Sequence, residues 1–153
     1  MKNIKLLMFF LVVNFGGLYI GNLLMERGPL TDWYSNLNKA PWTPPGWIFG
    51  ATWTLIMICF SFYLANIFSN NKSLNLKLVY VFQVVLNVSW NYFFFNIHKT
   101  TLALLIITAL LIVIVYFFTN YKSKPKSLQL LLLPYIIWLS IATSLNLYVV
   151  IHN

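Results

Sequence analysis

Long apolar runs separated by short polar segments dominate the pattern of this chain. Five runs, at about residues 4–25, 47–68, 78–97, 101–119 and 128–151, are each close to the roughly 20 residues with which a helix crosses a membrane. Runs such as 102–107 lack the alternation of apolar and polar residues that transmembrane β-strands show. The pattern predicts an all-α membrane protein, a five-transmembrane-helix bundle that forms a single domain over residues 1–153.

The first run and the first connection carry further local signals. The run follows Lys2 and Lys5, as in a signal peptide, but no small-residue cleavage site follows Met25, so we expect a membrane helix. The first connection, at 26–46, is the longest and is rich in proline, from Gly28-Pro29 to the segment Pro41-Trp42-Thr43-Pro44-Pro45-Gly46. Because proline fixes φ and lacks a backbone donor, we expect a rigid, structured first loop here.

The composition agrees with a membrane location and excludes several classes of function. Hydrophobic residues make up 60% and charged residues 8%, whereas soluble domains carry about 25% charged residues. The cations lie scattered between apolar runs, so they form no basic face for nucleic acid. The lone Cys59 excludes an intrachain disulfide. Aromatic residues, at 18%, exceed what interfacial belts require, so we expect some rings to line a cavity.

Positive charge is distributed unequally over the two sides of the predicted bundle. Five crossings put the amino terminus and the second and fourth connections on one side, with Lys2, Lys5, Lys72, Lys77, Lys122, Lys124 and Lys126. The other side carries only Arg27, Lys39 and Lys99, together with both acids, Glu26 and Asp32. This asymmetry predicts a cytoplasmic amino terminus, with the first loop and the carboxyl terminus outside.

Polar and aromatic side chains recur at helical spacing within the runs. The third run has Gln83, Asn87 and Asn91 at steps of four, with Trp90 beside them. Amides facing lipid are costly, so this face should point into the bundle, where it either joins helices or contacts a ligand. The fifth run has a comparable stripe of Tyr135, Trp138, Ala142, Leu145 and Asn146. The first run has Gly17 and Gly21, a spacing typical of helix dimers but also frequent by chance.

Standard catalytic chemistry is missing from the sequence. It has no P-loop, GxGxxG, GxSxG or HExxH motif. The centres of the runs contain no charged residue or histidine, so a proton-coupled transporter would lack its relay. We therefore expect no metal site and no required cofactor. A neutral apolar or aromatic ligand, held by indole stacking and amide hydrogen bonds, fits the residues better.

Four ordered motifs resemble those of the translocator protein family, also called the tryptophan-rich sensory protein or peripheral-type benzodiazepine receptor family, and indicate a bacterial-type member. They are Trp33-Tyr34 with the segment 41–46, Gly50 with Trp53, Gln83 to Phe94 in the third run, and Leu133-Pro134-Tyr135 to Asn146 in the fifth. The resemblance covers nearly the whole chain. It implies five transmembrane helices, usually as a homodimer, around a pocket beneath the first loop.

The resemblance also implies a ligand and its binding residues. The ligand would be a porphyrin or haem-type tetrapyrrole, or a synthetic benzodiazepine-site compound, bound by a membrane sensor or regulator. Carried over by position, the pocket residues would be Tyr34, Trp53, Asn87, Trp90, Trp138 and Ala142, with Trp42 and Pro44 in the loop above. Alternatives are light- and oxygen-dependent degradation of protoporphyrin through Trp53 and Trp138, porphyrin or sterol transport, and a purely structural membrane subunit.

The chain departs from this family pattern in three places. Tyr148 is followed by no Lys or Arg, so the resemblance does not extend to the mammalian cholesterol-recognition motif. Val81, Val85 and Ser89 stand where a dimer seam of small residues would need Gly or Ala. Apolar residues around Ile107 replace an acid that some relatives carry in the fourth helix.

Overall fold

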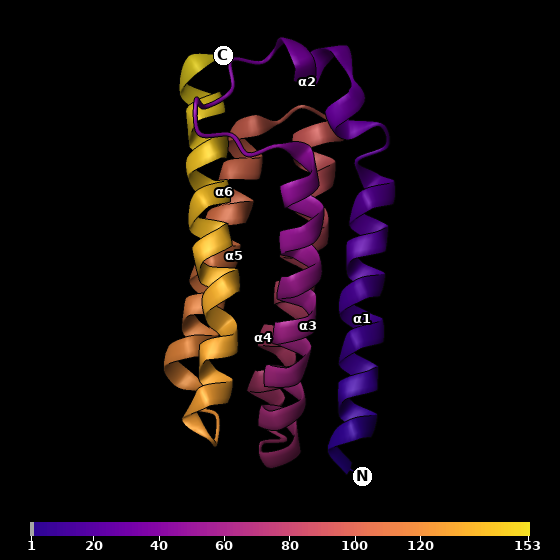
Figure 1. The fold of residues 1–153 in the computed structure, drawn as a ribbon, viewed down its shortest axis with the longest axis vertical. Coiled ribbons are helices and arrows are strands. Elements are labelled where there is room, and N and C mark those ends of the chain that lie inside the picture. The colour runs from indigo at the N-terminus through magenta and orange to yellow at the C-terminus, as the bar shows by residue number, and fades with distance from the viewer. Residues whose placement is uncertain (1) are drawn as a thin grey trace.

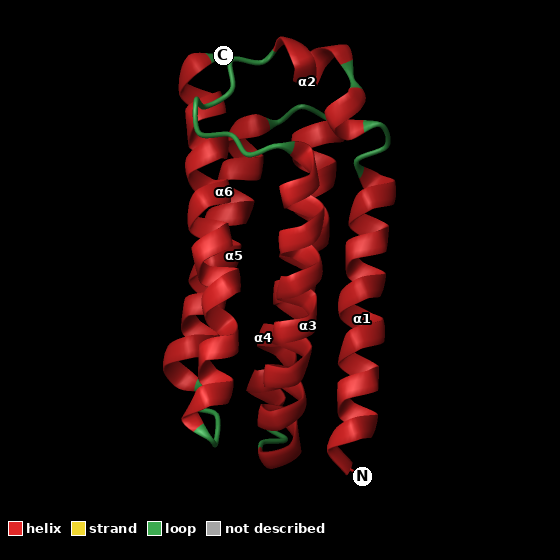
Figure 2. Cartoon of the chain, in the orientation of Figure 1, coloured by secondary structure: helices red, strands yellow, loops and turns green. Residues whose placement is uncertain are grey.

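The computed structural model describes residues 2–153, with side chains from Ile4 onward, and consists of five long helices standing side by side (Figure 1). These are α1 (Lys2–Leu24), α3 (Gly46–Asn70), α4 (Leu74–Asn91), α5 (Thr100–Asn120) and α6 (Leu133–His152). Shorter elements are η1 (Gly28–Leu30), α2 (Asp32–Asn36), η2 (Tyr92–Asn96) and η3 (Lys126–Leu132). The described residues contain no strand (Figure 2), and five helices are long and apolar enough to cross a membrane. The predicted all-helical five-span bundle is confirmed.

Capping residues and proline set the helix boundaries. α4 begins at Leu74, earlier than the predicted position 78, because the Ser73 Oγ accepts a hydrogen bond from the backbone N–H of Leu76. α6 begins at Leu133, later than the predicted position 128, and has Pro134 in its first turn, where a missing N–H is tolerated. The tighter 3₁₀ helix η3 covers the preceding residues 126–132.

The five long helices pack as a ring. α1 contacts α3 and α4, α4 contacts α5, α5 contacts α6, and α6 closes the ring against α3. Buried aromatic rings fill the centre, where Phe60 lies edge-on to Phe117 and Tyr135 with centroids 5.8 and 5.4 Å apart. Apolar side chains also cover the outside, among them Leu105 and Ile112, as expected for a bundle surrounded by lipid.

The two glycines of α1 pack against α4 of the same chain. A Cβ added at Gly17 would lie 3.6 Å from the Val88 side chain, and one added at Gly21 would come within 2.6 Å of the Asn91 Nδ2. Small residues at these positions let the two helix backbones approach closely. The glycine spacing therefore serves packing between α1 and α4 within the chain.

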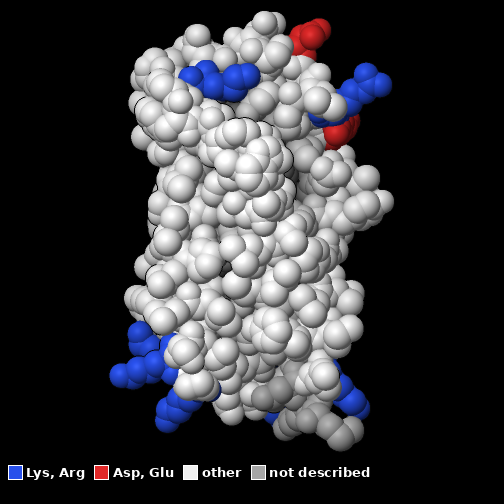
Figure 3. Space-filling view, viewed as in Figure 1, with Lys and Arg blue, Asp and Glu red and all other residues white. Residues whose placement is uncertain are grey.

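The two ends of the bundle differ in charge (Figure 3). We call the end that holds the amino terminus the basic end, because the described lysines at the start of α1 and in the α3–α4 and α5–α6 connections gather there. The opposite end carries both acids and the carboxyl terminus. Residues 25–45, which we call the lid, lie over this opposite end and include η1 and α2 (Figure 1). The predicted first loop is therefore structured.

Candidate functional site

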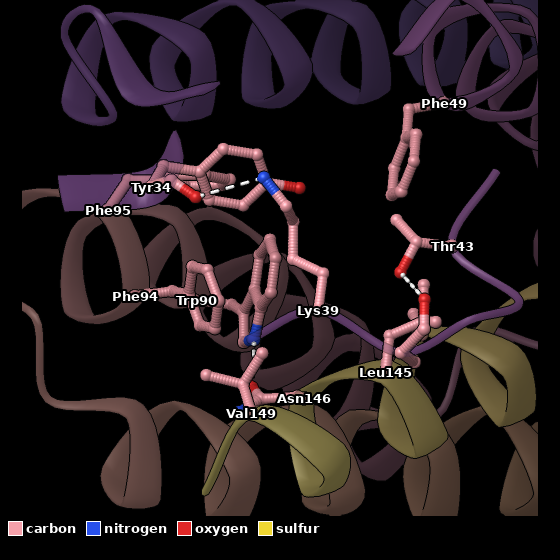
Figure 4. Close-up of a pocket in the computed structure, with 12 residues that line it drawn as sticks. Tyr34, Lys39, Thr43, Phe49, Trp90, Phe94, Phe95, Leu145, Asn146 and Val149 are labelled. Atoms are coloured by element: carbon pink, nitrogen blue, oxygen red, sulfur yellow. Dashed lines mark hydrogen bonds between the residues drawn. The ribbon is translucent and has the colours of Figure 1, made fainter. Parts of the chain in front are cut away.

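A small cavity lies between the lid and the top of the bundle (Figure 4). The lid contributes Tyr34, Lys39, Ala40 and Thr43 to its lining. The bundle contributes Phe49 of α3, Trp90 of α4, and Phe94 and Phe95 of η2. α6 contributes Ala142, Leu145, Asn146 and Val149. The cavity volume is about 50 Å³, which holds only a few water molecules.

Trp90 is held in one orientation at the cavity wall. Its Nε1 donates a hydrogen bond to the Asn146 Oδ1 at 3.1 Å, and the Asn146 Nδ2 donates to the backbone oxygen of Thr100 at 3.0 Å. The Asn146 side chain is only 2% exposed, so both of its hydrogen bonds form away from lipid and water. The indole of Trp90 also stacks on the ring of Phe94, with centroids 5.1 Å apart and planes 20° apart. These contacts fix an aromatic wall that joins α4, α5 and α6.

A π-helical turn brings two consecutive rings to the same cavity. The turn covers Tyr92–Asn96, and the backbone N–H of Ile97 donates to the Tyr92 oxygen at 3.1 Å. Adjacent residues of an α-helix point about 100° apart, but in this turn Phe94 and Phe95 both line the cavity. Phe95 lies edge-on to Trp90 with centroids 5.8 Å apart. π-Turns of this kind are frequent at functional sites.

Aromatic contacts fasten the lid on two sides of the cavity. On one side, Trp33 stacks on His98 in the connection between α4 and α5, with centroids 3.9 Å apart. On the other, Trp42 lies edge-on to Tyr148 of α6 at 5.5 Å, and its Nε1 donates to the Ser144 Oγ at 3.2 Å. The lid is thus attached mainly through side chains, which can separate without unfolding a helix.

Lys39 is the only charged residue among those that line the cavity. Its Nζ lies 4.6 Å from the centre of the Tyr34 ring and donates to the Tyr34 backbone oxygen at 3.1 Å. Burial raises the pKa of the Tyr34 hydroxyl above its usual value, because the charged form would lose its hydration. Tyr34 therefore stays neutral and able to donate a hydrogen bond. One cation and one hydroxyl suit an anionic group on an otherwise apolar ligand.

Three of the residues that the sequence predicts for the pocket come together at this cavity, namely Tyr34, Trp90 and Ala142. Trp42 and Pro44 belong to the lid, as predicted, but neither lines the cavity. Trp42 is 54% exposed and lies on the outer side of the lid against α6, while Pro44 is half-buried beside the lining residue Thr43.

Trp53, Trp138 and Asn87 lie deeper in the bundle and outside the cavity lining. The ring of Trp138 meets Phe49 edge-on at 5.1 Å, and the ring of Trp53 meets Tyr135 edge-on at 5.8 Å. Since Phe49 lines the cavity, a single ring separates Trp138 from it. Asn87 is half-buried on α4, about one turn before Trp90.

The amides of α4 contact different neighbours. Gln83 is 2% exposed, and its Nε2 donates to the Tyr135 hydroxyl of α6 at 2.9 Å. Asn91 instead lies against Gly21 of α1. In an α-helix, each step of four residues turns the side-chain direction by about 40° beyond a full turn. The amides therefore point toward α6 at Gln83 and toward α1 at Asn91. Gln83 therefore joins two helices, as one of the two predicted roles requires.

Phe49 and Phe95 are lining residues that the sequence did not single out. Phe49 precedes Trp53 by four residues, a spacing that puts both on one helix face and could have indicated Phe49. Phe95 follows Phe94 directly, and both rings lie in the π-turn and line the cavity. The four-residue aromatic segment 92–95 was the available signal, since it concentrates rings at one helix end.

Comparison with known proteins gives a consistent result. The sequence profile of the TspO/MBR family matches residues 9–151. The tryptophan-rich protein TspO of Chlorobaculum tepidum is 31% identical over 122 residues, covering 77% of each chain. The tryptophan-rich protein TspO of Archaeoglobus fulgidus is 32% identical over 125 residues, covering 79% of this chain and 80% of the relative. The translocator protein of Ovis aries is 32% identical over 126 residues, covering 78% of this chain and 74% of the relative.

Proposed function

The chain belongs to the TspO/MBR family, and we propose that it is a sensor or regulator that binds a porphyrin or related tetrapyrrole beneath its lid. Its family and its five apolar helices make it an integral, multi-pass membrane protein. Among its relatives, one from Cereibacter sphaeroides is named tryptophan-rich sensory protein. We infer a sensory role for this chain as well, and the cavity supports a tetrapyrrole as its ligand.

The aromatic lining of the cavity is the observation that carries the proposal. Trp90, Phe94 and Phe95 form a wall of rings on which a flat macrocycle can stack, and α6 adds apolar surface opposite the lid. Lys39 and the neutral Tyr34 hydroxyl offer one positive charge and one donor for the carboxylates of a porphyrin. A synthetic benzodiazepine-site compound would use the same rings.

Binding of a macrocycle requires the lid to move. The cavity has about 50 Å³, whereas small-molecule sites usually measure about 300–1,000 Å³. The bundle below is closely packed, with Tyr135 and Phe60 fully buried, so expansion must come from above. Because side-chain contacts fasten the lid, it can swing outward while the five long helices stay in place.

Quenching of tryptophan fluorescence by protoporphyrin IX tests this function. We expect saturable quenching of the purified protein in detergent, with an apparent affinity that Trp90→Phe weakens about 5- to 10-fold, since a hydrogen bond and part of a stacking surface are lost. Trp47→Phe is the matched control, because Trp47 is 74% exposed at the start of α3 and lies away from the cavity. Linear quenching without saturation, or equal affinities in both variants, would contradict binding at this wall.

Membrane orientation and oligomeric state complete the proposal. The basic end faces the cytoplasm, because cations concentrate on the cytoplasmic side of membrane proteins, and the lid then lies on the external side. The family resemblance supports a homodimer. The glycines of α1 do not supply its contact, since both pack against α4.

One contact favours a second function, the light-dependent degradation of protoporphyrin. Trp138 packs edge-on against Phe49, so its oxidisable indole lies one ring behind the cavity lining. A porphyrin seated under the lid would then be close enough for its light-excited state to react with that indole. Degradation products that appear only under illumination and oxygen separate this function from simple binding.

A further inference from the structure

A second and larger hollow lies on the outside of the bundle, between α1 and α4 near the basic end. Its volume is about 470 Å³, and α1 provides Leu6, Phe9 and Val13 to its walls while α4 provides Val81 and Val85. We call this hollow the α1–α4 groove. It is separate from the cavity under the lid and shares no lining residue with it.

Aromatic rings form the floor of the α1–α4 groove. The rings of Phe10, Phe68 and Tyr80 contact one another, with Phe10 4.8 Å from Phe68 and 5.2 Å from Tyr80. The Tyr80 hydroxyl donates to the Asn14 Oδ1 at 2.9 Å in a buried contact. Because its hydroxyl is bonded to Asn14, Tyr80 contributes its ring to the groove. Lys77 is the charged residue of the lining.

Two parallel stripes of residues lead from the basic end into the groove. α1 and α4 run in the same direction, because α3 returns the chain between them (Figure 1). Lys5, Phe9 and Val13 follow one another at steps of four on α1, and Lys77, Val81 and Val85 do so on α4. Residues four apart share a helix face. Each wall therefore begins with a lysine at the basic end and continues with apolar side chains.

The dimensions of the stripes match one leaflet of a bilayer. At about 1.5 Å per residue, the helix from Lys77 to Val85 spans about 12 Å. The hydrocarbon core of a bilayer is about 30 Å thick, so one leaflet contributes about 15 Å. A groove of this length with cations at its mouth is complementary to an acyl chain that carries an anionic headgroup. We propose that the α1–α4 groove binds an anionic phospholipid from the leaflet at the basic end, with its phosphate between Lys5 and Lys77.

Charge favours a lipid over a second copy of the chain as the occupant. Copies related by a two-fold axis along the membrane normal would bring the same ends together, so the lysines of both copies would face each other. The chain has only two acids, Glu26 and Asp32, and both lie at the lid end, where they cannot pair with Lys5 or Lys77. An anionic headgroup supplies the missing negative charge.

Native mass spectrometry of the purified protein tests the lysine pair. In detergent with equal amounts of phosphatidylglycerol and phosphatidylcholine, we expect one retained phosphatidylglycerol for each chain. Lys5→Gln with Lys77→Gln should lower the preference for phosphatidylglycerol by roughly 30-fold, the factor expected for two cations near anionic lipid. The matched control, Lys122→Gln with Lys126→Gln, removes the same charge at the same end but away from the groove. An equal loss in both double variants would overturn a localised site.

Filling the groove tests where the acyl chain lies. Val81 is 56% exposed in the groove, so Val81→Trp should displace the lipid. Ile112→Trp places the same ring on the lipid-facing side of α5, where Ile112 is 64% exposed, and should retain it. Loss of a dimer from the spectrum of Val81→Trp, with phosphatidylglycerol still retained, would assign the groove to a second copy and overturn the proposal. An unchanged helical circular dichroism spectrum and a single elution peak in detergent show that each variant is folded.

Discussion

The Asn153 side chain at the end of α6 binds both backbone groups of Asn38 in the lid. The Asn153 Oδ1 accepts from the Asn38 backbone N–H at 2.9 Å, and the Asn153 Nδ2 donates to the Asn38 backbone oxygen at 3.3 Å, across 115 residues of sequence. The Asn38 Nδ2 also donates to the His152 backbone oxygen at 3.0 Å. A side-chain amide can do this because it carries a donor and an acceptor together. The pair closes the lid over the cavity.

Asn153→Ala should loosen the lid. Two hydrogen bonds to Asn38 are lost, each contributing about 0.5–1.5 kcal/mol, so the lid should open about 5- to 150-fold more often. Hydrogen–deuterium exchange should therefore be faster at residues 33–43, and protoporphyrin should associate faster. Asn120→Ala is the control, because the hydrogen bonds of that side chain lie at the basic end of α5. Identical lid exchange in the two variants would show that other contacts hold the lid.

Lys39→Gln should weaken binding of porphyrins that carry carboxylates. Lys39 is the charged residue of the cavity lining, and a part-buried charged hydrogen bond contributes about 1–2 kcal/mol, so affinity for protoporphyrin IX should fall about 5- to 30-fold. Octaethylporphyrin has no carboxylate and should bind the original protein and Lys39→Gln equally. Lys99→Gln removes a charge at the same end but outside the cavity and should leave both affinities unchanged. A parallel loss for both porphyrins would indicate that Lys39 only supports the fold of the lid.

Gly21→Ala should stabilise the chain less than Gly16→Ala, because the new side chain must displace the Asn91 amide at the contact between α1 and α4. The new Cβ at position 21 would lie 2.6 Å from the Asn91 Nδ2, but the one at position 16 has no neighbour within 4 Å. Alanine favours a helix by about 1 kcal/mol over glycine, so Gly16→Ala gains stability and Gly21→Ala loses that gain to overpacking. Thermal unfolding in detergent should rank Gly21→Ala below Gly16→Ala. Adding Asn91→Ala should remove most of the difference, and its persistence would place the clash elsewhere.

The sequence predicted the fold because each span carries its own signal. Apolar length alone identifies five membrane helices, and the segment 41–46 excludes a continuous helix that would join the first two. The boundaries of α4 and α6 were less accurate, since the Ser73 cap and the 3₁₀ helix before Pro134 are local details that hydropathy does not register. The alternating direction of the five long helices gathers most of the cations at one end, as their spacing along the chain implies.

The site was less predictable because it depends on contacts across the bundle. Periodicity identified Trp90 and Ala142, each on a stripe that turned out to face inward. It could not identify Phe95, whose position depends on a π-turn, or the small volume of the cavity, which depends on how the lid packs. It also could not show that the Phe49 ring packs against Trp138, since the two residues belong to different helices. Such relationships arise between helices, where a pattern along one helix carries no information.

Membrane orientation can be measured with cysteine labelling in whole cells. On a Cys59→Ser background, Asn36→Cys places a thiol in the exposed part of the lid, and Ser127→Cys places one at the basic end. The concentration of lysines at the basic end predicts that a membrane-impermeant maleimide labels position 36 in intact cells and labels position 127 only after permeabilisation. The opposite labelling would invert the proposed topology and place the lid in the cytoplasm.

Trp138→Phe should reduce light-dependent degradation of protoporphyrin far more than it reduces binding. Trp138 lies behind Phe49 rather than in the cavity lining, so its replacement by another ring should leave affinity within about a factor of 2, the effect of a few tenths of a kcal/mol. Phenylalanine is much harder to oxidise than tryptophan, and if the indole is the reacting group, the rate should fall at least about tenfold, equivalent to about 1.4 kcal/mol of barrier.

Trp53→Phe should have a smaller effect, because Trp53 contacts Tyr135 and not the Phe49 ring that lines the cavity. Absorbance changes under constant illumination and oxygen, at matched porphyrin occupancy, provide the measurement, with the exposed Trp47→Phe as control. If all three variants degrade porphyrin at the original rate, the buried indoles serve packing alone, and binding without degradation is the function that the cavity supports.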